Sequence, residues 1–288
     1  MPLQLQPLHP LFAAQASGID IGQPLSPESV REIERAMDQY AVLVFRDQPL
    51  GQEQQLAFAK SFGPLDLGLK KATRPAANLT GYDEIIDISN VDAQGRVYDR
   101  DHRKVVSNLA NQLWHSDSSF QKPAARYSIL HAVVVPPAGG ETEFADLRAA
   151  YDALPADLKH KVEGLHSPHY ALHSRLWLGE KYSQAELDAL PPAEWPLVRE
   201  HAGSKRKLLW VGVHATHIKE MAFGEGRMLL AELLEHATQR EFVFRHAWRA
   251  GDSVMWDNRA VLHRGRRFDL SQHRELRRTS TQDVPAAA

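Results

Sequence analysis

The C-terminal third of the sequence alternates short apolar segments with turn residues, and this pattern constrains the fold more than any other feature. Segments of this kind, bounded by Gly, Asp and Asn, are typical of β-strands. One clear helix, over residues 226–239, interrupts them. The expected strands cover residues 207–213, 241–248, 253–256, 259–263 and 274–282. This part of the chain therefore predicts a core built mainly from β-sheet.

The N-terminal half mixes helices with strands. Ser26 is a plausible N-cap and Pro27 occupies the first helical position, which predicts a helix over residues 26–40. A helical region starting at Asp146 is broken at Pro155. The other expected elements are strands over residues 41–45, 84–89 and 127–135 and a helix over residues 51–63. Without a repeat or a flexible linker, residues 1–288 are expected to form a single α+β domain around a sandwich or barrel.

The composition restricts the chemistry. The sequence contains no cysteine, which excludes disulfides, thiolate nucleophiles and iron–sulfur clusters. A transition metal would need His, Asp or Glu ligands, which suit iron(II), manganese or a catalytic zinc. The formal net charge is -2, so no overall field favours nucleic acid or an anionic membrane. With no signal-peptide pattern and no long apolar run, a cytoplasmic location is the default expectation.

The first candidate for a metal site is the stretch QLWHSDSSF, which places His115 two residues before Asp117. This spacing alone is weak, because His273 and Glu275 repeat it and about two such triplets are expected by chance from the composition. If the stretch is a strand, both side chains point to the same face. A 2-His-1-carboxylate triad would then need one further histidine, and would leave metal positions open for substrate and dioxygen.

His263 can supply the missing imidazole. It ends an apolar strand and is followed by three arginines within four residues, where a neutral, metal-bound state is reasonable. An ordinary hydrogen-bonded histidine at a strand end is an equally weighted alternative. For five other histidines, a surface or structural role is favoured over metal binding. These are His166, His169, His173, His214 and His217.

The segment RELRRTS adds two candidates for anion binding. On a strand, Arg274, Leu276 and Arg278 share one face. If Leu276 faces the core, both guanidinium groups also point inward, about 13 Å apart along the strand. A buried guanidinium needs an anionic partner, so two inward arginines suggest two carboxylate-bearing ligands. A fully exposed strand is the alternative of similar weight.

Four segments together resemble the taurine dioxygenase superfamily of iron(II)- and 2-oxoglutarate-dependent oxygenases. In chain order they are FAKSFGPL, LWHSDSSF, GGETEFAD and WDNRAVLH. The similarity covers nearly the full chain. Within the superfamily it is greatest to the 2,4-dichlorophenoxyacetate dioxygenases, through QPLHPLFAA, PAARYSILHAVVVPPAGGETEF and LLAELLEHATQREFVFRH.

The resemblance implies an α+β fold with a mainly β core, a double-stranded β-helix or jelly-roll with flanking helices. It implies that His115, Asp117 and His263 bind iron(II). The co-substrate 2-oxoglutarate would chelate the iron through its C1 carboxylate and C2 carbonyl. Its far carboxylate would then pair with Arg274 and with the hydroxyl group of Thr142.

The resemblance also implies a site for a small anionic substrate. Arg278 matches the arginine that binds the anionic group, and Asn111 matches a residue of the same pocket. Lys71 is a further candidate, with a solvated loop lysine as the equal alternative. The implied reaction uses O2 to hydroxylate the methylene group of an aryloxyacetate while 2-oxoglutarate becomes succinate and carbon dioxide. The hydroxylated product collapses to a phenol and glyoxylate.

Three alternatives remain at the level of the sequence. A member of the same superfamily could act on a sulfonate such as taurine, a sulfate ester or another carboxylate. A zinc-dependent hydrolase could use the same three ligands with a bound water. A non-catalytic jelly-roll is the third alternative, against which an intact triad weighs. The expected partner is a small molecule rather than nucleic acid or membrane, and a homo-oligomer is left open.

Overall fold

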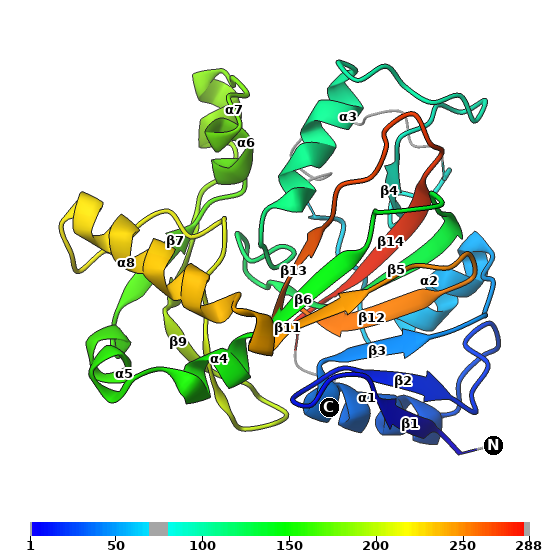
Figure 1. Ribbon diagram of the computed structural model, residues 1–288, viewed down its shortest axis with the longest axis horizontal. Helices are drawn as coiled ribbons and strands as arrows, with labels where there is room; N and C mark the ends of the chain where they lie inside the picture. Colours follow the sequence, from blue (N-terminus) through cyan, green and yellow to red (C-terminus); the bar gives the residue numbers. More distant parts are fainter. Residues whose placement is uncertain (1, 69–79, 285–288) are drawn as a thin grey trace.

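Two β-sheets face each other across the centre of the protein, which we describe from a computed structural model over residues 2–68 and 80–284 (Figure 1). In spatial order, the main sheet contains β1 (Gln4–Pro7), β2 (Ala14–Ser17), β3 (Val42–Phe45), β12 (Ser253–Asp257), β5 (Ala125–Val134), β14 (Glu275–Gln282) and β4 (Ile86–Ser89). The second sheet contains β11 (Val243–His246), β6 (Thr142–Asp146) and β13 (Val261–Gly265). Neighbouring strands are antiparallel except β2 and β3.

Strands of the main sheet are apolar on both faces because both faces are covered. In β3, Val42 and Val44 join the cluster between the two sheets, together with Phe144 of β6. The alternate residues Leu43 and Phe45 join a second cluster on the outer face. This double burial explains why the sequence shows a continuous apolar run here rather than an alternating one.

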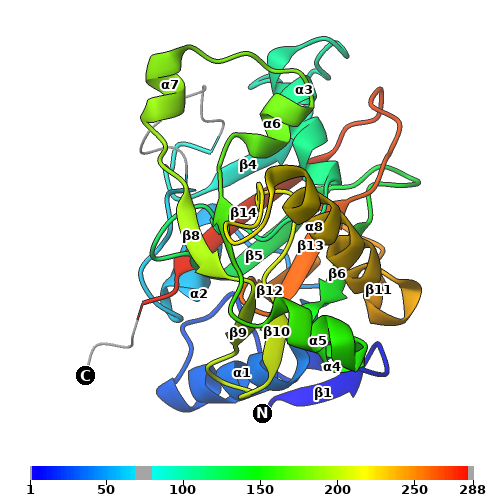
Figure 2. The ribbon, with the colours of Figure 1, turned by 90° about the vertical axis from the view of Figure 1, so that its left-hand side faces the viewer.

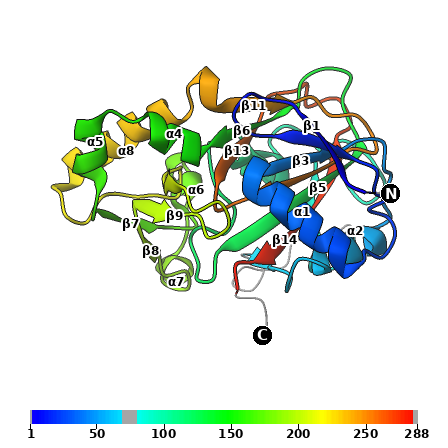
Figure 3. The same ribbon diagram turned by 90° about the horizontal axis from the view of Figure 1, so that it is seen from below.

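Helices α1 (Pro27–Tyr40) and α2 (Gln52–Lys60) cover the outer face of the main sheet (Figure 3). The hydroxyl group of Ser26 caps α1 by accepting a hydrogen bond from the backbone N–H of Ser29. The helix ends at Ala41, whose left-handed backbone (φ 57°) turns the chain directly into β3. Both helices and the strand after α1 agree with the sequence prediction.

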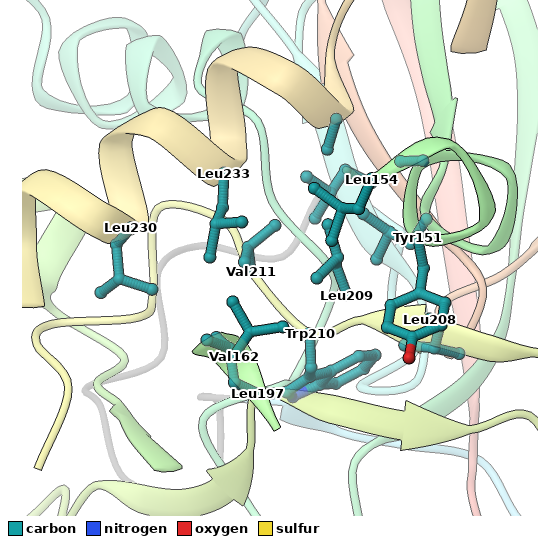
Figure 4. Packing of buried hydrophobic residues seen from close by; sticks show 14 of the residues in the cluster. Tyr151, Leu154, Val162, Leu197, Leu208, Leu209, Trp210, Val211, Leu230 and Leu233 are labelled. Carbon is teal, nitrogen blue, oxygen red and sulfur yellow. The ribbon is translucent and has the colours of Figure 1, made fainter. Parts of the chain in front are cut away.

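A separate lobe packs beside the second sheet (Figure 2). It contains α4 (Leu147–Ala153), α5 (Ala156–Val162), α6 (His173–Trp177), α7 (Gln184–Asp188) and α8 (Phe223–Ala237). Two hairpins complete it, β7 (His166–His169) with β8 (Ala193–Pro196) and β9 (Val198–Glu200) with β10 (Lys207–Leu209). The buried apolar residues of its core pack around Trp210, and Leu233 of α8 faces Val211 (Figure 4). The break at Pro155 separates α4 from α5, as predicted.

Some predicted boundaries are wrong. The strand expected over residues 207–213 ends at Leu209, because Val213 instead donates its N–H to the carbonyl group of Trp114. The segment 241–248 begins as a 3-10 turn, Arg240–Phe242, before β11. The elements that the sequence did not predict are β1, β2, β7, β8, β9, α6, α7, α3 (Arg103–Asn108) and the 3-10 turn η2 (Leu109–Gln112). Among the described residues, no helix has the length and apolarity needed to cross a bilayer.

Phe144 offers a test of the packing between the sheets. Its ring is fully buried against Trp256 and Phe244. We expect Phe144→Ala to lower the free energy of unfolding by about 3–5 kcal/mol, because it opens a cavity between the sheets. Urea unfolding followed by circular dichroism measures this change. The control is Phe223→Ala on the exposed surface of α8, with an expected change within about 0.5 kcal/mol; equal effects would contradict the packing described.

Candidate active site

The structure brings His115, Asp117 and His263 together. Each offers one ligand atom, and the three atoms all lie within 4.8 Å of one another. The Nε2 atom of His115 lies 3.9 Å from Oδ1 of Asp117, and Nε2 of His263 lies 3.8 Å from Oδ2. All three side chains are buried. Three donors at these separations can converge on one metal ion from one side.

The convergence does not come from a strand through residues 115–117, as the sequence analysis assumed. His115 lies in an isolated β-bridge, in which His115 and His263 exchange two backbone hydrogen bonds of 3.0 and 2.8 Å. Asp117 lies in the turn that follows. The bridge is the physical reason that two histidines far apart in the chain become neighbours, with ring centroids 4.1 Å apart.

Hydrogen bonds fix the orientation of the ligands. Nδ1 of His115 lies 2.7 Å from the carbonyl oxygen of Leu113, so this nitrogen carries the proton and Nε2 keeps its lone pair. The backbone N–H of Asp117 donates to Oδ1 of Asn258. The hydroxyl group of Ser128 donates to Oδ2 of Asp117 at 2.8 Å and accepts a hydrogen bond from Nδ2 of Asn258.

Ser128 and Asn258 were missed by the sequence analysis. The available signal was weak: a serine inside the apolar run YSILHAVVV has to find a hydrogen-bond partner when it is buried.

The charges of the three ligands suit a divalent cation. Burial acts to raise the pKa of Asp117, but Arg278 and the two imidazoles lower it to about 2. Burial lowers the pKa of His115 and places that of His263 well below its usual value. One anionic carboxylate and two neutral imidazoles therefore meet at neutral pH, as an iron(II) ligand set requires.

A second cluster of possible metal ligands is already occupied by hydrogen bonds within the protein. Asp38, His201 and Asp257 also bring their ligand atoms within 4.8 Å of one another. The carboxylate of Asp257 already accepts hydrogen bonds from Nε and Nη2 of Arg259, at 2.9 and 2.6 Å. His201 adds a further contact at 3.0 Å. Both ring nitrogens of His201 are engaged within the protein, Nδ1 with Ser204 and Nε2 with Asp257, so the imidazole has no free nitrogen for a metal. The group therefore stabilises the end of β12 rather than offering a metal site.

A cavity opens beside the metal triad. It is lined by His115 and His263 and by four of the other predicted site residues: Asn111, Thr142, Arg274 and Arg278. Most of the remaining wall is apolar, from Ile88, Val105, Leu109, Leu130, Trp256, Phe268 and Leu270. Lys71 lies outside the described residues. A mainly apolar cavity with a few convergent polar groups is typical of a small-molecule site.

Arg274 is a buried cation without an acidic partner among the described residues. Its nearest acceptors are the carbonyl oxygens of Ile88 and Gly140, both at 3.4 Å, and its Nε has no partner within residues 2–68 and 80–284. Burial lowers its pKa to about 10. The side chain of Asn90 accepts a hydrogen bond from the backbone N–H of Arg274 and holds the start of β14. The guanidinium is thus fixed, desolvated and available to an anion.

Arg278 lies closer to the triad. Its Nη1 donates to Oδ1 of Asp117 at 2.6 Å, while its Nε is buried without a partner among the described residues. A guanidinium has five N–H groups, so the bond to Asp117 leaves several for a second anion. Arg274, Leu276 and Arg278 all face inward, as the alternation of the strand predicted.

Of the five histidines assigned surface or structural roles, four contact protein groups away from the metal triad. His166 pairs with Glu220, and His169 contacts Ser119. His173 and His217 contact the carbonyl group of Val213 and the hydroxyl group of Thr216. His214 differs, because its ring lies perpendicular to that of His115 with centroids 6.1 Å apart.

Comparison with known proteins assigns the chain to a protein family. Residues 4–280 match the model of the "Taurine catabolism dioxygenase TauD, TfdA family". The chain belongs to this family of dioxygenases. It is 62% identical to the alpha-ketoglutarate-dependent 2,4-dichlorophenoxyacetate dioxygenase of Cupriavidus pinatubonensis, over 98% of this chain and 99% of that protein. The corresponding Burkholderia protein is 57% identical, over 98% of this chain and 95% of that protein.

A solved structure agrees with the assignment. AAD-2, in complex with Mn(II) and N-oxalylglycine, is 44% identical and superposes with a TM-score of 0.91 over the full length of both chains. The predicted jelly-roll fold and the prediction of an iron(II)- and 2-oxoglutarate-dependent dioxygenase are both confirmed. Membership of the family also removes the zinc-dependent hydrolase from consideration.

Ser128 provides a test of the metal centre. We expect Ser128→Ala to weaken binding of iron(II) or Mn(II) by roughly 10- to 100-fold, because Asp117 loses the hydroxyl group that orients it. Calorimetric titration of the metal into the metal-free protein measures the affinity. Ser183→Ala, at the exposed start of α7, is the control and should bind as the unmodified protein does. Unchanged affinity in Ser128→Ala would show that Ser128 has no part in orienting Asp117.

Proposed function

We propose that the protein hydroxylates the methylene group of an aryloxyacetate such as 2,4-dichlorophenoxyacetate. One oxygen atom of O2 enters the carbon–hydrogen bond, and the other enters succinate as 2-oxoglutarate loses carbon dioxide. The hydroxylated product is a hemiacetal, which separates into a phenol and glyoxylate. The high identity to the dioxygenases of Cupriavidus and Burkholderia supports this substrate class.

One observation carries the site assignment: Arg274 is buried in the cavity of the triad and lacks an anionic partner among the described residues. Leaving such a charge unpaired is unfavourable, and a carboxylate can bind a guanidinium through two parallel hydrogen bonds. We assign the far carboxylate of 2-oxoglutarate to Arg274 and to the hydroxyl group of Thr142 on the same cavity wall. Gly140 leaves room there, because a Cβ atom at this position would lie 3.2 Å from Nε of Arg274.

His115, Asp117 and His263 are the proposed ligands of iron(II). When bound, iron(II) supplies the activation of dioxygen that carbon–hydrogen hydroxylation requires. The protein contributes the fixed orientation of three ligands, of which Asp117 is held from both sides by Ser128 and Arg278. The apolar cavity wall excludes bulk water from the reaction.

Arg278 is the proposed anchor of the substrate carboxylate. It already holds Asp117 through Nη1, so a carboxylate bound to its remaining N–H groups must lie close to the metal ligands. In an aryloxyacetate, the methylene carbon is bonded directly to that carboxylate. Anchoring the carboxylate therefore places the reacting carbon beside the metal centre. Asn111, from η2, would border the same substrate, and Lys71 remains a further candidate.

A sulfonate or sulfate ester is the alternative within the family. An alkylsulfatase of Acinetobacter baylyi is 30% identical over 96% of this chain and 84% of that protein. A guanidinium can bind either kind of anion, so Arg278 does not decide between them. The much higher identity to the aryloxyacetate enzymes favours the carboxylate. A cytoplasmic location completes the proposal.

Two substitutions, one directly before β14 and one within it, separate the proposed roles of Arg274 and Arg278. We expect Arg274→Gln to weaken 2-oxoglutarate binding by roughly 30-fold or more, since it removes one partner of a buried charge pair, with little effect on the aryloxyacetate. Arg278→Gln should show the reverse pattern at saturating Mn(II), a condition that is needed because this variant also loses the contact to Asp117. Arg277→Gln is the control, because this side chain points to the opposite face and contacts the carbonyl group of Leu50. Anaerobic titrations of Mn(II)-loaded protein measure both affinities; equal losses in both variants would contradict the assignment.

The substrate class is tested by oxygen consumption with iron(II) and 2-oxoglutarate. The panel contains phenoxyacetates, 2-phenoxypropionates, a cinnamate-like acid and taurine. We expect the fastest turnover with 2,4-dichlorophenoxyacetate, with phenol and glyoxylate formed in equal amounts. Turnover of taurine without turnover of any phenoxyacetate would instead establish a sulfonate substrate.

A further inference from the structure

An indole group supports the cavity from behind Thr142. The N–H of Trp248 donates a hydrogen bond to Oγ1 of Thr142 at 3.0 Å. Thr142 is buried and lines the cavity together with Arg274. Within the described part of the chain, Trp248 does not belong to the cavity lining. Trp248 follows β11, and its near neighbour His246 lies directly opposite Thr142 in the register of β11 and β6. Trp248 therefore contacts the cavity wall through Thr142.

The chemistry of the two groups fixes the direction of the hydrogen bond. An indole nitrogen can only donate, so Oγ1 of Thr142 must accept. The hydrogen of the threonine hydroxyl group then has to point away from the indole. Within the described part of the chain, Oγ1 has no other hydrogen-bond partner. The hydroxyl group is left as a donor, which is the state that can bind a carboxylate oxygen.

We propose that Trp248 is a positioning residue for 2-oxoglutarate, acting by holding the hydroxyl group of Thr142 as a donor toward the far carboxylate. Without the indole N–H, no group among the described residues fixes the rotation of this hydroxyl group. The bound carboxylate would then keep Arg274 but lose a ready donor. This inference rests on the proposed function, because it assumes that 2-oxoglutarate occupies the cavity.

The surroundings of Trp248 restrict its movement. Its ring meets that of His246 at 84°, with centroids 4.5 Å apart, a favourable edge-to-face arrangement. The side chain of His246 is fully buried, and its Nε2 lies 3.3 Å from Oδ2 of Asp252. Asp252 is bound in turn by Arg46 and by the backbone N–H of Arg249. The indole is thus held in place by a chain of contacts that ends at the surface.

The test replaces the N–H while keeping an aromatic ring. We expect Trp248→Phe to weaken binding of 2-oxoglutarate to Mn(II)-loaded protein by roughly three- to tenfold, measured by anaerobic calorimetry. Affinity for the aryloxyacetate should stay unchanged, since the substrate binds at Arg278. Trp177→Phe, at a residue that is 63% exposed, is the matched control and should alter neither affinity.

A double-mutant cycle separates positioning from general support of the fold. Thr142→Val removes the hydroxyl group, so adding Trp248→Phe to it should cause no further loss of 2-oxoglutarate affinity. In a Thr142→Ser background, which keeps the hydroxyl group, the loss should persist. If Trp248→Phe folds poorly, site-specific β-(3-benzothienyl)alanine at position 248 serves instead, because it keeps the bicyclic shape and lacks the N–H.

The possible results of these titrations distinguish failure of the role of Trp248 from failure of the proposed function. An unchanged affinity in Trp248→Phe, or an equal loss in the Thr142→Val background, overturns the role of Trp248. In both cases the unmodified protein still binds 2-oxoglutarate, so the proposed function stands. If the unmodified Mn(II)-loaded protein does not bind 2-oxoglutarate at all, the proposed function fails, and this inference fails with it.

Discussion

The whole site depends on one backbone interaction, the isolated bridge between His115 and His263. Two hydrogen bonds join the loop that follows η2 to β13, and they bring one imidazole from that loop beside another from a strand. The bridge also sets the start of the turn that carries Asp117. The lobe supports this segment from the other side, where Val213 donates its N–H to the carbonyl group of Trp114. The metal ligands therefore lie where the β core, a connecting loop and the lobe meet.

The buried charged groups of this region differ in whether the protein itself supplies an oppositely charged partner. Asp117 is balanced within the protein by Arg278, and Asp257 by Arg259. Arg274 is not balanced by any acidic group among the described residues. A buried guanidinium without an anion costs folding free energy, which a carboxylate-bearing ligand would recover on binding. The cavity is thus prepared for an anionic co-substrate before any ligand enters it.

Sequence periodicity predicted those parts of the site that lie on regular strands. Alternation along residues 274–278 placed Arg274 and Arg278 on the face of Leu276. The apolar run before His263 placed that residue on a strand, although His263 lies in the middle of β13 and not at its end as predicted. Periodicity could not place Asp117, because a turn has no period. The convergence with His115 was expected for a reason that proved wrong, since a bridge and a turn replace the assumed strand.

The supporting residues were hidden for a different physical reason. Ser128 reaches Asp117 only because the register of β5 pairs it with Trp256 of β12 on one side and with Ser280 of β14 on the other. Register is a property of two strands together, and neither sequence segment alone contains it. The same holds for Trp248, whose distance from Thr142 follows from the pairing of β11 with β6. Residues that touch a ligand carry a chemical signature in the sequence, whereas residues that orient them become visible only when the strands are paired.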